Sequence, residues 1–461
     1  MLQTLETLTG EFVGIVWGLP LVFALCFSGL FFTVYFGFPQ LRFFKHALQV
    51  VSGKFDDESK KGEISHFQAL CAALSATVGL GNIAGVAVAI SLGGPGAVFW
   101  LWVAGFIGMA TKFAEVTLAL KYREVADNGT VHGGPMFTIK NGLSKKFYPL
   151  AWAYALFTIL SSFGAGNMFQ SNQMASVLNS SLNVPTWVSG LIFCVFATMV
   201  LIGGIKRIGK VTEKLVPVMV TVYVLGALGI LGMNFGNLPS IISQIITDAF
   251  TGTAAVGGFA GAAFKEVVIM GIRRATFSNE AGMGSAAMAH SAAKSEPVQE
   301  GIVALLEPFI DTIVICSITA LALLSTGAWS QAGIEGSDMT AWAFESAYGP
   351  LGRGIVTMTV TLFAFSTIIS WSYYGEQGVT FIFGEKGIKY YRYVFIGFIF
   401  IGAIAQLQLV LNVSDAVYGL LAIPNLIGTY FLLYKVKNAL KEYDTSIGRT
   451  PTEADLKAKL S

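Results

Sequence analysis

The chain has 461 residues, of which 54% are hydrophobic and 12% are charged, with a formal net charge of +2 at pH 7. Soluble domains carry about 25% charged residues, so this composition excludes an ordinary soluble domain and indicates a membrane protein. The four cysteines lie in apolar segments and the four histidines show no metal-binding spacing, so neither a disulfide framework nor an organic cofactor is indicated. Nothing resembles a phosphate-binding loop, and we expect neither ATP nor nucleic acid as a partner.

Long apolar stretches follow one another along the chain, and residues 12–41 and 147–205, for example, contain no charged residue. A membrane-spanning helix needs about 20 apolar residues, whereas a β-barrel would show short alternating segments. The sequence therefore predicts an all-α membrane protein with about eleven spans in a lipid bilayer. Their expected bounds are residues 12–37, 67–91, 97–121, 148–179, 186–204, 213–233, 265–290, 301–326, 355–383, 391–408 and 413–435.

Lysine and arginine concentrate in alternate loops, namely those after the first, third, fifth, seventh and ninth predicted spans. The other loops contain only Lys265 and Arg353 near their edges. Because positively charged loops stay on the cytoplasmic side, we expect the N-terminus outside and a cytoplasmic tail at 436–461. This arrangement predicts a multi-pass protein of the plasma or inner membrane.

Two predicted spans contain the same interruption. Residues 79–84 read GLGNIA and residues 282–287 read GMGSAA, and both fit the pattern Gly-x-Gly-polar-x-Ala. The two segments are five spans apart and run in opposite directions in the predicted topology. Such a pair indicates a transporter built from inverted repeats. We expect one transport domain over 1–461, with an extra N-terminal helix at 12–37 and five-helix repeats at 67–233 and 265–435.

Glycine lets the backbone leave helical geometry, and the N–H and C=O groups released in this way cannot be satisfied by hydrocarbon. Helix N-termini favour a carboxylate, and free carbonyls favour a small hard cation. One site could therefore bind an ion and an amino acid together, as in a symporter. The alternative is close helix packing, because residues 81–85 also match GxxxG.

Two segments resemble the alanine/glycine:cation symporter family. They are SATVGLGNIAGVAVAISLGGPGAVFWLW at 75–102, in which Leu101 replaces the family's usual methionine, and RRATFSNEAGMGSAAMAHSAAKSEPVQEG at 273–301. The resemblance extends over essentially the whole chain. It implies sodium-coupled uptake of alanine or glycine on the leucine-transporter fold, with one additional N-terminal helix.

The resemblance also implies where the substrate and the ions bind. The substrate would bind along the stretch from Thr77 to Asn82, which includes Gly79. The backbone amides of Leu80 and Gly81 would face the substrate carboxylate. The carbonyls of Ser75 and Val78 would serve one sodium ion. The Thr77 carbonyl and the Asn82 side chain would serve a second, nearer the substrate.

Polar side chains at membrane depth provide further candidates. Ser366, Thr367 and Ser370 lie within about one helical turn and can face a sodium ion, although such hydroxyls often bond back to their own helix. Asn167, Gln170 and Gln173 share a helix face, and we expect Gln170, the central one, to contact the substrate. Phe277 and Trp371 could cap the pocket or simply pack in the core.

Charged residues within membrane spans are costly and tend to be functional. Arg273 and Arg274 are expected to pair with an acid in an outer gate, and the candidates are Glu280, Glu307 and Asp311. Lys112 and Glu115 lie one turn apart and are expected to form a structural pair.

The absence of a lysine in the middle of the sixth span favours sodium over proton coupling, because such an ammonium group could replace the ion. The alternatives are a proton-coupled transporter of another small neutral amino acid, a channel, or a sensor without transport. No nucleophile–histidine or paired-carboxylate constellation stands out, so we do not expect an enzyme.

Overall fold

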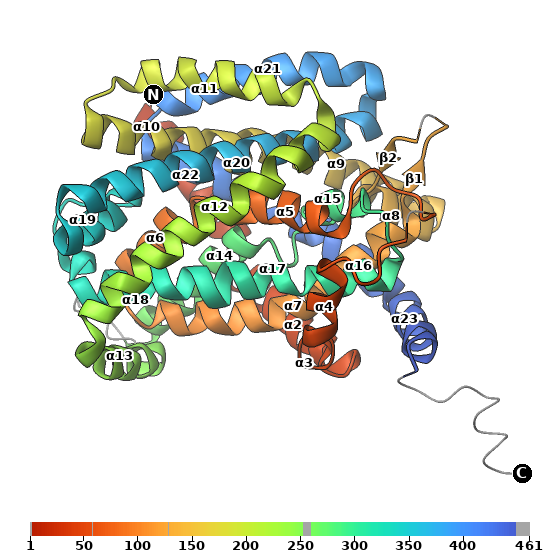
Figure 1. The fold of residues 1–461 in the computed structure, drawn as a ribbon, viewed down its shortest axis with the longest axis horizontal. Coiled ribbons are helices and arrows are strands. Elements are labelled where there is room, and N and C mark those ends of the chain that lie inside the picture. Colours follow the sequence, from red (N-terminus) through yellow and green to blue (C-terminus); the bar gives the residue numbers. More distant parts are fainter. Residues whose placement is uncertain (1, 58, 128, 252–259, 449–461) are drawn as a thin grey trace, which may run out of the picture.

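The computed structural model describes residues 2–57, 59–127, 129–251 and 260–448, and nearly all regular structure in them is helical (Figure 1). The two short strands, β1 (Glu124–Val125) and β2 (Val131–His132), pair in antiparallel register. The helices of the first half are α1 (Leu2–Val16), α2 (Leu19–Tyr35), α3 (Pro39–Arg42), α4 (Phe44–Val51), α5 (His66–Thr77), η1 (Gly81–Gly85), α6 (Val86–Gly93), α7 (Ala97–Tyr122), α8 (Pro135–Gly142), η2 (Lys145–Phe147), α9 (Tyr148–Phe163), η3 (Gly164–Met168), α10 (Phe169–Leu182), α11 (Thr186–Leu201) and α12 (Gly204–Met233).

The second half contains η4 (Phe235–Asn237), α13 (Leu238–Thr251), α14 (Ala260–Asn279), α15 (Ala287–Ser291), α16 (Pro297–Ala304), α17 (Leu306–Pro308), η5 (Phe309–Cys316), α18 (Ser317–Thr326), η6 (Ala328–Ser330), α19 (Ser337–Tyr348), α20 (Pro350–Phe383), η7 (Glu385–Gly387), α21 (Ile388–Ile404), α22 (Leu407–Gly419) and α23 (Ala422–Ser446). The predicted tail is therefore helical as far as Ser446, and its last part, 449–461, lies outside the described residues.

Within the described residues, 8 helices are long and apolar enough to cross a membrane, and the bent pair α5 and α6 makes up to 9. The two further predicted spans correspond to α11, which is apolar but shorter, and to α14. Charged side chains, among them Arg273 and Arg274, lower the hydropathy of α14. The eleven-span count and the inverted repeat stay predictions, whereas the all-helical membrane architecture is confirmed.

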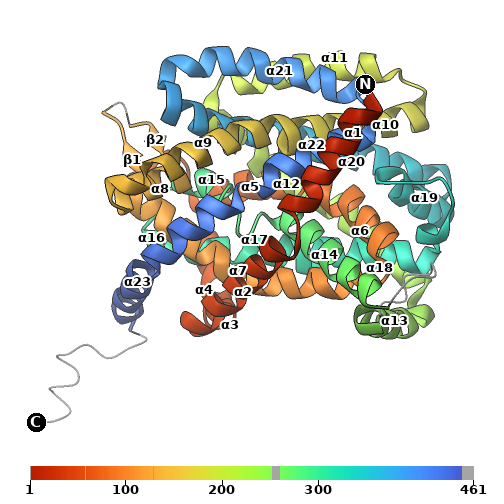
Figure 2. The ribbon, with the colours of Figure 1, turned by 180° about the vertical axis from the view of Figure 1, so that it is seen from behind.

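The first predicted span is two helices, because the chain breaks at Trp17 and Gly18 between α1 and α2. A proline at the start of α2 ends the preceding helix, since it offers no backbone N–H donor. Figure 2 shows α1 and α2 crossing the face of the molecule that also carries α22 and α23, and α1 packs against α22.

Two long helices organise the interior. α7 packs against α2, α14 and α16, while α20 packs against α5, α9, α10, α12 and α19. The helices α11 and α21 pair at the edge that lies at the top of Figure 1. The broken segment lies between these groups, with α5 against α12 and α20 and with η1 against α14, α19 and η5.

Side chains are distributed as expected for a protein in lipid. Large apolar side chains are exposed along the outer helices, including Phe23 on α2, Trp187 and Phe196 on α11, and Ile401 on α21. Serine, threonine, asparagine and glutamine side chains are buried in the interior, where they bond to backbone and to one another. Polar groups are thus kept away from hydrocarbon, which cannot satisfy them.

An odd number of spans places the two termini on opposite sides of the membrane. We expect a green fluorescent protein fused after the tail to fluoresce in the cytoplasm and alkaline phosphatase fused before α1 to be active outside. Eight spans, by contrast, would place both reporters on the same side.

Candidate functional site

The first interruption lies between α5 and α6, whose axes are bent by 49°. α5 begins with a capping box, in which Ser65 Oγ accepts from the Gln68 amide and Gln68 Oε1 accepts from the Ser65 amide. Helical geometry ends at Thr77, and the chain resumes as the π-helical turn η1. Three residues between them, 78–80, therefore expose their backbone groups inside the molecule.

Side chains accept the hydrogen bonds of these released amides. The Gly79 amide donates to Asn82 Oδ1 at 2.9 Å, and the Leu80 amide donates to Gln170 Oε1 at 3.3 Å. A Cβ on Gly79 would lie 2.3 Å from Thr367 Oγ1, and one on Gly81 would lie 3.1 Å from the Ser278 Cα. Glycine is required here because α20 and the last turn of α14 approach the backbone closely.

The second interruption follows α14 at residues 280–286. Glu280, Gly282 and Gly284 all have positive φ, which the two glycines adopt without strain. Asn425 Nδ2 donates to the Gly282 carbonyl at 2.8 Å, and the Tyr154 hydroxyl donates to the Met283 carbonyl at 2.8 Å. Both predicted interruptions are thus real breaks in helical structure.

A small cavity of about 10 Å³ lies against the first interruption, and η3, α10, α14, α20 and α22 supply the rest of its wall. It is lined by six of the predicted substrate residues together with Ala76, Ala165 and Tyr418; the six are Thr77, Gly79, Gly81, Gln170, Phe277 and Trp371. The seventh, Leu80, is fully buried and bonded to Gln170. This volume holds about one water molecule, so a larger guest requires the surrounding side chains to move.

Aromatic rings close one side of this cavity. Tyr418 lies 5.9 Å from Trp371 and 5.2 Å from Phe277, measured between ring centroids. A Cβ on Gly166 would lie 2.3 Å from the Trp371 ring, so this glycine in η3 allows the indole to sit against α9 and α10. The cavity wall is thus set by close backbone approach and ring packing together.

The predicted first cation position gathers four hydroxyl side chains, each at most 2% exposed. Ser75 Oγ donates to the Ser366 carbonyl at 2.7 Å, and Ser370 Oγ donates to Ser75 Oγ at 2.9 Å. The Ser75 carbonyl accepts from Thr367 Oγ1 at 3.0 Å and from Ser366 Oγ at 3.4 Å. α5 and α20 are thus joined by oxygen atoms of the type that a hard cation prefers, beside Val78, whose side chain is fully buried.

The predicted second position centres on Asn82, whose side-chain nitrogen donates to Asp311 Oδ1 at 2.6 Å. Ser278 Oγ donates to the same oxygen at 2.9 Å. Thr77 Oγ1, by contrast, bonds back to the Ala73 carbonyl at 3.1 Å. Asn82 is therefore linked to a buried carboxylate on η5 and to the last turn of α14.

Of the three amide side chains predicted to share a helix face, only Gln170 lines the cavity. Asn167 Nδ2 donates to the Phe395 carbonyl of α21 at 2.7 Å. Gln173 Oε1 accepts from the Ser337 amide and hydroxyl at 3.2 and 3.0 Å. The other two amides hold helices together, as polar residues often do within membranes.

The expected partners of Arg273 and Arg274 were wrong. Both guanidinium groups contact Asp415 on α22, rather than any of the three acids considered from the sequence. Trp17 Nε1 also donates to the Asp415 carbonyl at 2.8 Å. The reason is tertiary, because this face of α14 is covered by α22, a segment distant in sequence.

The predicted pair of Lys112 and Glu115 was also wrong. Lys112 Nζ contacts Glu307 Oε2 at 3.1 Å, and Glu115 Oε1 accepts from Asn425 Nδ2 at 2.5 Å. Both side chains are buried, and each finds a partner on another helix. Although Lys112 and Glu115 lie one turn apart on α7, contacts with neighbouring helices decide their partners.

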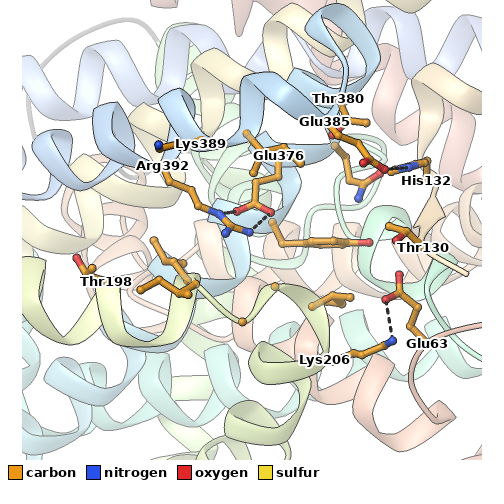
Figure 3. A pocket seen from close by; sticks show the side chains of 18 of the residues that line it. Glu63, Thr130, His132, Thr198, Lys206, Glu376, Thr380, Glu385, Lys389 and Arg392 are labelled. Atoms are coloured by element: carbon orange, nitrogen blue, oxygen red, sulfur yellow. Dashed lines mark hydrogen bonds and ion pairs between the residues drawn. The ribbon is translucent and has the colours of Figure 1, made fainter. Parts of the chain in front are cut away.

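Wider cavities lie beyond the central one at both ends. One, of about 370 Å³, is lined by Gln173, Asp338 and Arg353 near the α18–α19 loop, which is predicted to be outside. The other, of about 640 Å³, lies on the predicted cytoplasmic side between α12, α20 and α21. Three ion pairs border it, namely Glu376 with Arg392, His132 with Glu385, and Glu63 with Lys206 (Figure 3).

Sequence reasoning missed Ser278 and Tyr418 as neighbours of the site and treated Asp311 only as a possible partner of an arginine. Ser278 could have been found as the first residue of the polar run Ser278-Asn279-Glu280 that precedes the second glycine pair. Tyr418 carries no local signal, because it reaches the cavity from α22 by folding. Among the described residues no group of three or more His, Cys, Asp or Glu could hold a metal ion.

A bundle of membrane helices with two interrupted segments, the first of which lines a small central cavity, defines a membrane transporter. The chain is similar to the sodium/alanine symporter AgcS of Methanococcus maripaludis, with 43% identity over 93% of this chain and 95% of that protein. It is 36% identical to a probable sodium/glutamine symporter, GlnT of Bacillus subtilis, over 96% of this chain and 91% of that one. The fold is similar to that of MhsT in complex with L-phenylalanine, with a TM-score of 0.50 and 14% identity over 82% of this chain and all of that one.

The model of the sodium:alanine symporter family matches residues 2–456, and the chain belongs to this family. This confirms the resemblance drawn from the two motifs, and with it a role in sodium and amino acid symport.

The contact between Gly79 and α20 can be tested by adding one methyl group. We expect Gly79→Ala to abolish uptake of labelled alanine, because its Cβ would meet Thr367 Oγ1 at 2.3 Å and force the segments apart. Gly85→Ala is the matched control in the same broken span, since its nearest neighbour would lie at 3.8 Å. Unimpaired uptake by Gly79→Ala would show that the close approach has no role.

Proposed function

We propose that the protein imports a small neutral amino acid, alanine or glycine, together with sodium by alternating access. The observation that carries this proposal is the small cavity at the first interrupted segment, directly beside the Ser75 hydroxyl cluster. The site offers released backbone amides on one side and oxygen ligands on the other. These are the groups that an amino acid carboxylate and a sodium ion require.

In this proposal the substrate carboxylate binds at the amides of Leu80 and Gly81. Gln170 Oε1 already accepts from the Leu80 amide, and it is a neutral oxygen in the place where a carboxylate oxygen would bind. Rotation of the Gln170 side chain would free the backbone amide of Leu80 and would let the Gln170 side chain contact the substrate. The enclosing rings of Phe277, Trp371 and Tyr418 leave room for only a small side chain.

Sodium binds in this proposal at the carbonyls of Ser75 and Val78 together with hydroxyls of Ser366, Thr367 and Ser370. A cation there would replace the hydrogen bonds that now join α5 to α20. It would thereby fix the inner half of the broken span against the bundle.

A second cation would bind at the Thr77 carbonyl and at Asn82, with Ser278 and Asp311 completing the oxygen set. The Asp311 carboxylate is fully buried and already accepts hydrogen bonds from the side chains of Asn82 and Ser278. A carboxylate at this position would balance the charge of the ion.

Alternating access is supported by the cavities at both ends of a closed centre. One sodium ion moving down 100 mV supplies about 2.3 kcal/mol, and a tenfold concentration gradient adds about 1.4 kcal/mol. Together, roughly 3.7 kcal/mol per ion could sustain a gradient of several hundredfold in the amino acid. The inverted repeats at 67–233 and 265–435 would provide the two interchangeable conformations.

The proposal is tested by uptake into proteoliposomes containing the purified protein. We expect labelled alanine to accumulate with an inward sodium gradient but not when choline replaces sodium. Unlabelled alanine or glycine should compete, whereas phenylalanine should not, because the closed cavity is small. Equal accumulation in sodium and choline, with or without a proton gradient, would reject sodium coupling.

The sodium site is tested with Thr367→Val, which removes a hydroxyl but keeps the shape of the side chain. We expect the sodium concentration for half-maximal uptake to rise about tenfold, corresponding to about 1.4 kcal/mol for one lost ligand. Thr359→Val is the control, because among the described residues this buried hydroxyl on the same helix bonds only to the carbonyls of Ile355 and Val356. Similar shifts in both variants would mean that Thr367 has no specific part in ion binding.

A further inference from the structure

Five titratable side chains from five helices form a continuous chain in the interior, each at most 2% exposed. His66 Nδ1 lies 2.5 Å from Glu300 Oε2, and Glu300 Oε1 lies 2.7 Å from His290 Nδ1. His290 Nε2 lies 2.6 Å from Glu307 Oε1, and Glu307 Oε2 lies 3.1 Å from Lys112 Nζ. The proposed transport mechanism makes no use of this chain.

The position of His290 requires a proton beyond those of a neutral ring. A neutral imidazole has one donor nitrogen and one acceptor nitrogen, whereas an ionised carboxylate only accepts. Both ring nitrogens of His290 face glutamate oxygens, at 2.7 and 2.6 Å. Either the ring is an imidazolium or one of the two glutamates, Glu300 or Glu307, is protonated. One extra proton therefore belongs to the triad of Glu300, His290 and Glu307.

The charges of these five side chains agree with one extra proton at His290. Lys112 balances one of the two buried glutamates, and the proton at His290 balances the other. The further charged or titratable groups around the triad are Asp56, Glu115, Arg123, Glu280 and Tyr374. His132 on the nearby β2 pairs with Glu385 instead.

One end of the chain approaches the surface that we propose to be cytoplasmic. His66 Nε2 is buried and makes no hydrogen bond with a described residue, and it lies 3.8 Å from Oδ1 of the half-exposed Asp56. A proton taken up at Nε2 can displace the proton at Nδ1 onto Glu300, whose other oxygen contacts His290. The opposite end of the chain, at Lys112, is fully buried.

The chain joins the inner ends of both broken segments. His66 is the first residue of α5, and His290 lies in α15 just after the second interruption. Glu300 bridges the two histidines, so α5 and α15 are held together through one carboxylate. Movement of α5 away from α15, which would open the site inward, must break this bridge.

We propose that Glu300, His290 and Glu307 form a proton-binding site, loaded from the cytoplasmic side through His66, that holds the inner gate closed while the proton is bound. Loss of the proton leaves a ring nitrogen lone pair facing a carboxylate oxygen and an uncompensated buried charge, both of which are costly. Opening admits water to these groups and relieves the cost. The proton is a resident of the gate and is not transported with the substrate.

The test measures gate opening through Cys71, a buried thiol on α5 between His66 and Ser75. Labelling of the full-length protein by a water-soluble maleimide is followed by mass spectrometry of the Cys71 peptide. Glu307→Gln is the informative variant, because its amide donates to a neutral His290 and its oxygen still accepts from Lys112. This variant needs no extra proton, and its gate should stay closed at every pH.

We expect the two proteins to label equally near pH 7, and the wild type to label about fivefold faster than Glu307→Gln near pH 9.5, because the two flanking glutamates stabilise the charged ring and move its titration above the range of a free imidazole. Comparison at the same pH removes the intrinsic pH dependence of the thiol. Glu300→Gln should behave like Glu307→Gln, which guards against one variant failing to fold.

His46→Gln is the control. His46 is a buried histidine that does not belong to the row of five titratable side chains, and it bonds to the Tyr443 hydroxyl. It should keep the wild-type ratio. An equal rate in wild type and both glutamine variants at every pH, or loss of the pH effect in His46→Gln as well, would overturn the proposal.

The proton site controls a gate only if the protein works by the proposed alternating access. The labelling of Cys71, however, is measured independently of transport. If wild-type protein fails to accumulate alanine while Cys71 still shows the pH effect, the proposed function fails and the proton site stands. If alanine accumulates while labelling of Cys71 does not depend on the triad, the proton site fails alone.

Discussion

Backbone polarity inside the membrane is the constraint on which the rest of this structure depends. Hydrocarbon satisfies no N–H or C=O group, so a helix can be interrupted at this depth only where other groups take over its hydrogen bonds. Here the partners are Asn82 and Gln170 at the first interruption, and Asn425 and Tyr154 at the second. Each comes from a particular helix, so the two breaks fix the positions of several helices around them.

The interior charges obey the same constraint. Asp415 takes both Arg273 and Arg274, and its carbonyl accepts from Trp17, so the N-terminal helix, α14 and α22 meet at one residue. A Cβ on Gly419 would lie 2.8 Å from Trp17 Nε1, which shows how closely α22 approaches this ring. The junction between α1 and α2 is therefore attached through polar contacts as well as apolar packing.

The arrangement also separates two tasks along α5. Its C-terminal end carries Ser75, which joins the hydroxyls of α20, and its N-terminal end carries His66, which joins Glu300. Because α5 is a short rigid helix, a change at either end displaces the other. In our proposals an ion at one end and a proton at the other therefore act on the same movement.

The sequence by itself determined the membrane class, the family, the positions of both interruptions and most of the residues that line the cavity. Composition, glycine spacing and local motifs carry this information, because a lipid environment permits only helices and penalises any break. Tertiary structure alone decided the partners. Lys112 pairs with Glu307 rather than Glu115, Arg273 and Arg274 meet Asp415, and Tyr418 reaches the cavity from α22. These contacts join segments far apart in the chain, and a buried charge pairs with whichever opposite charge the packing of helices brings to it.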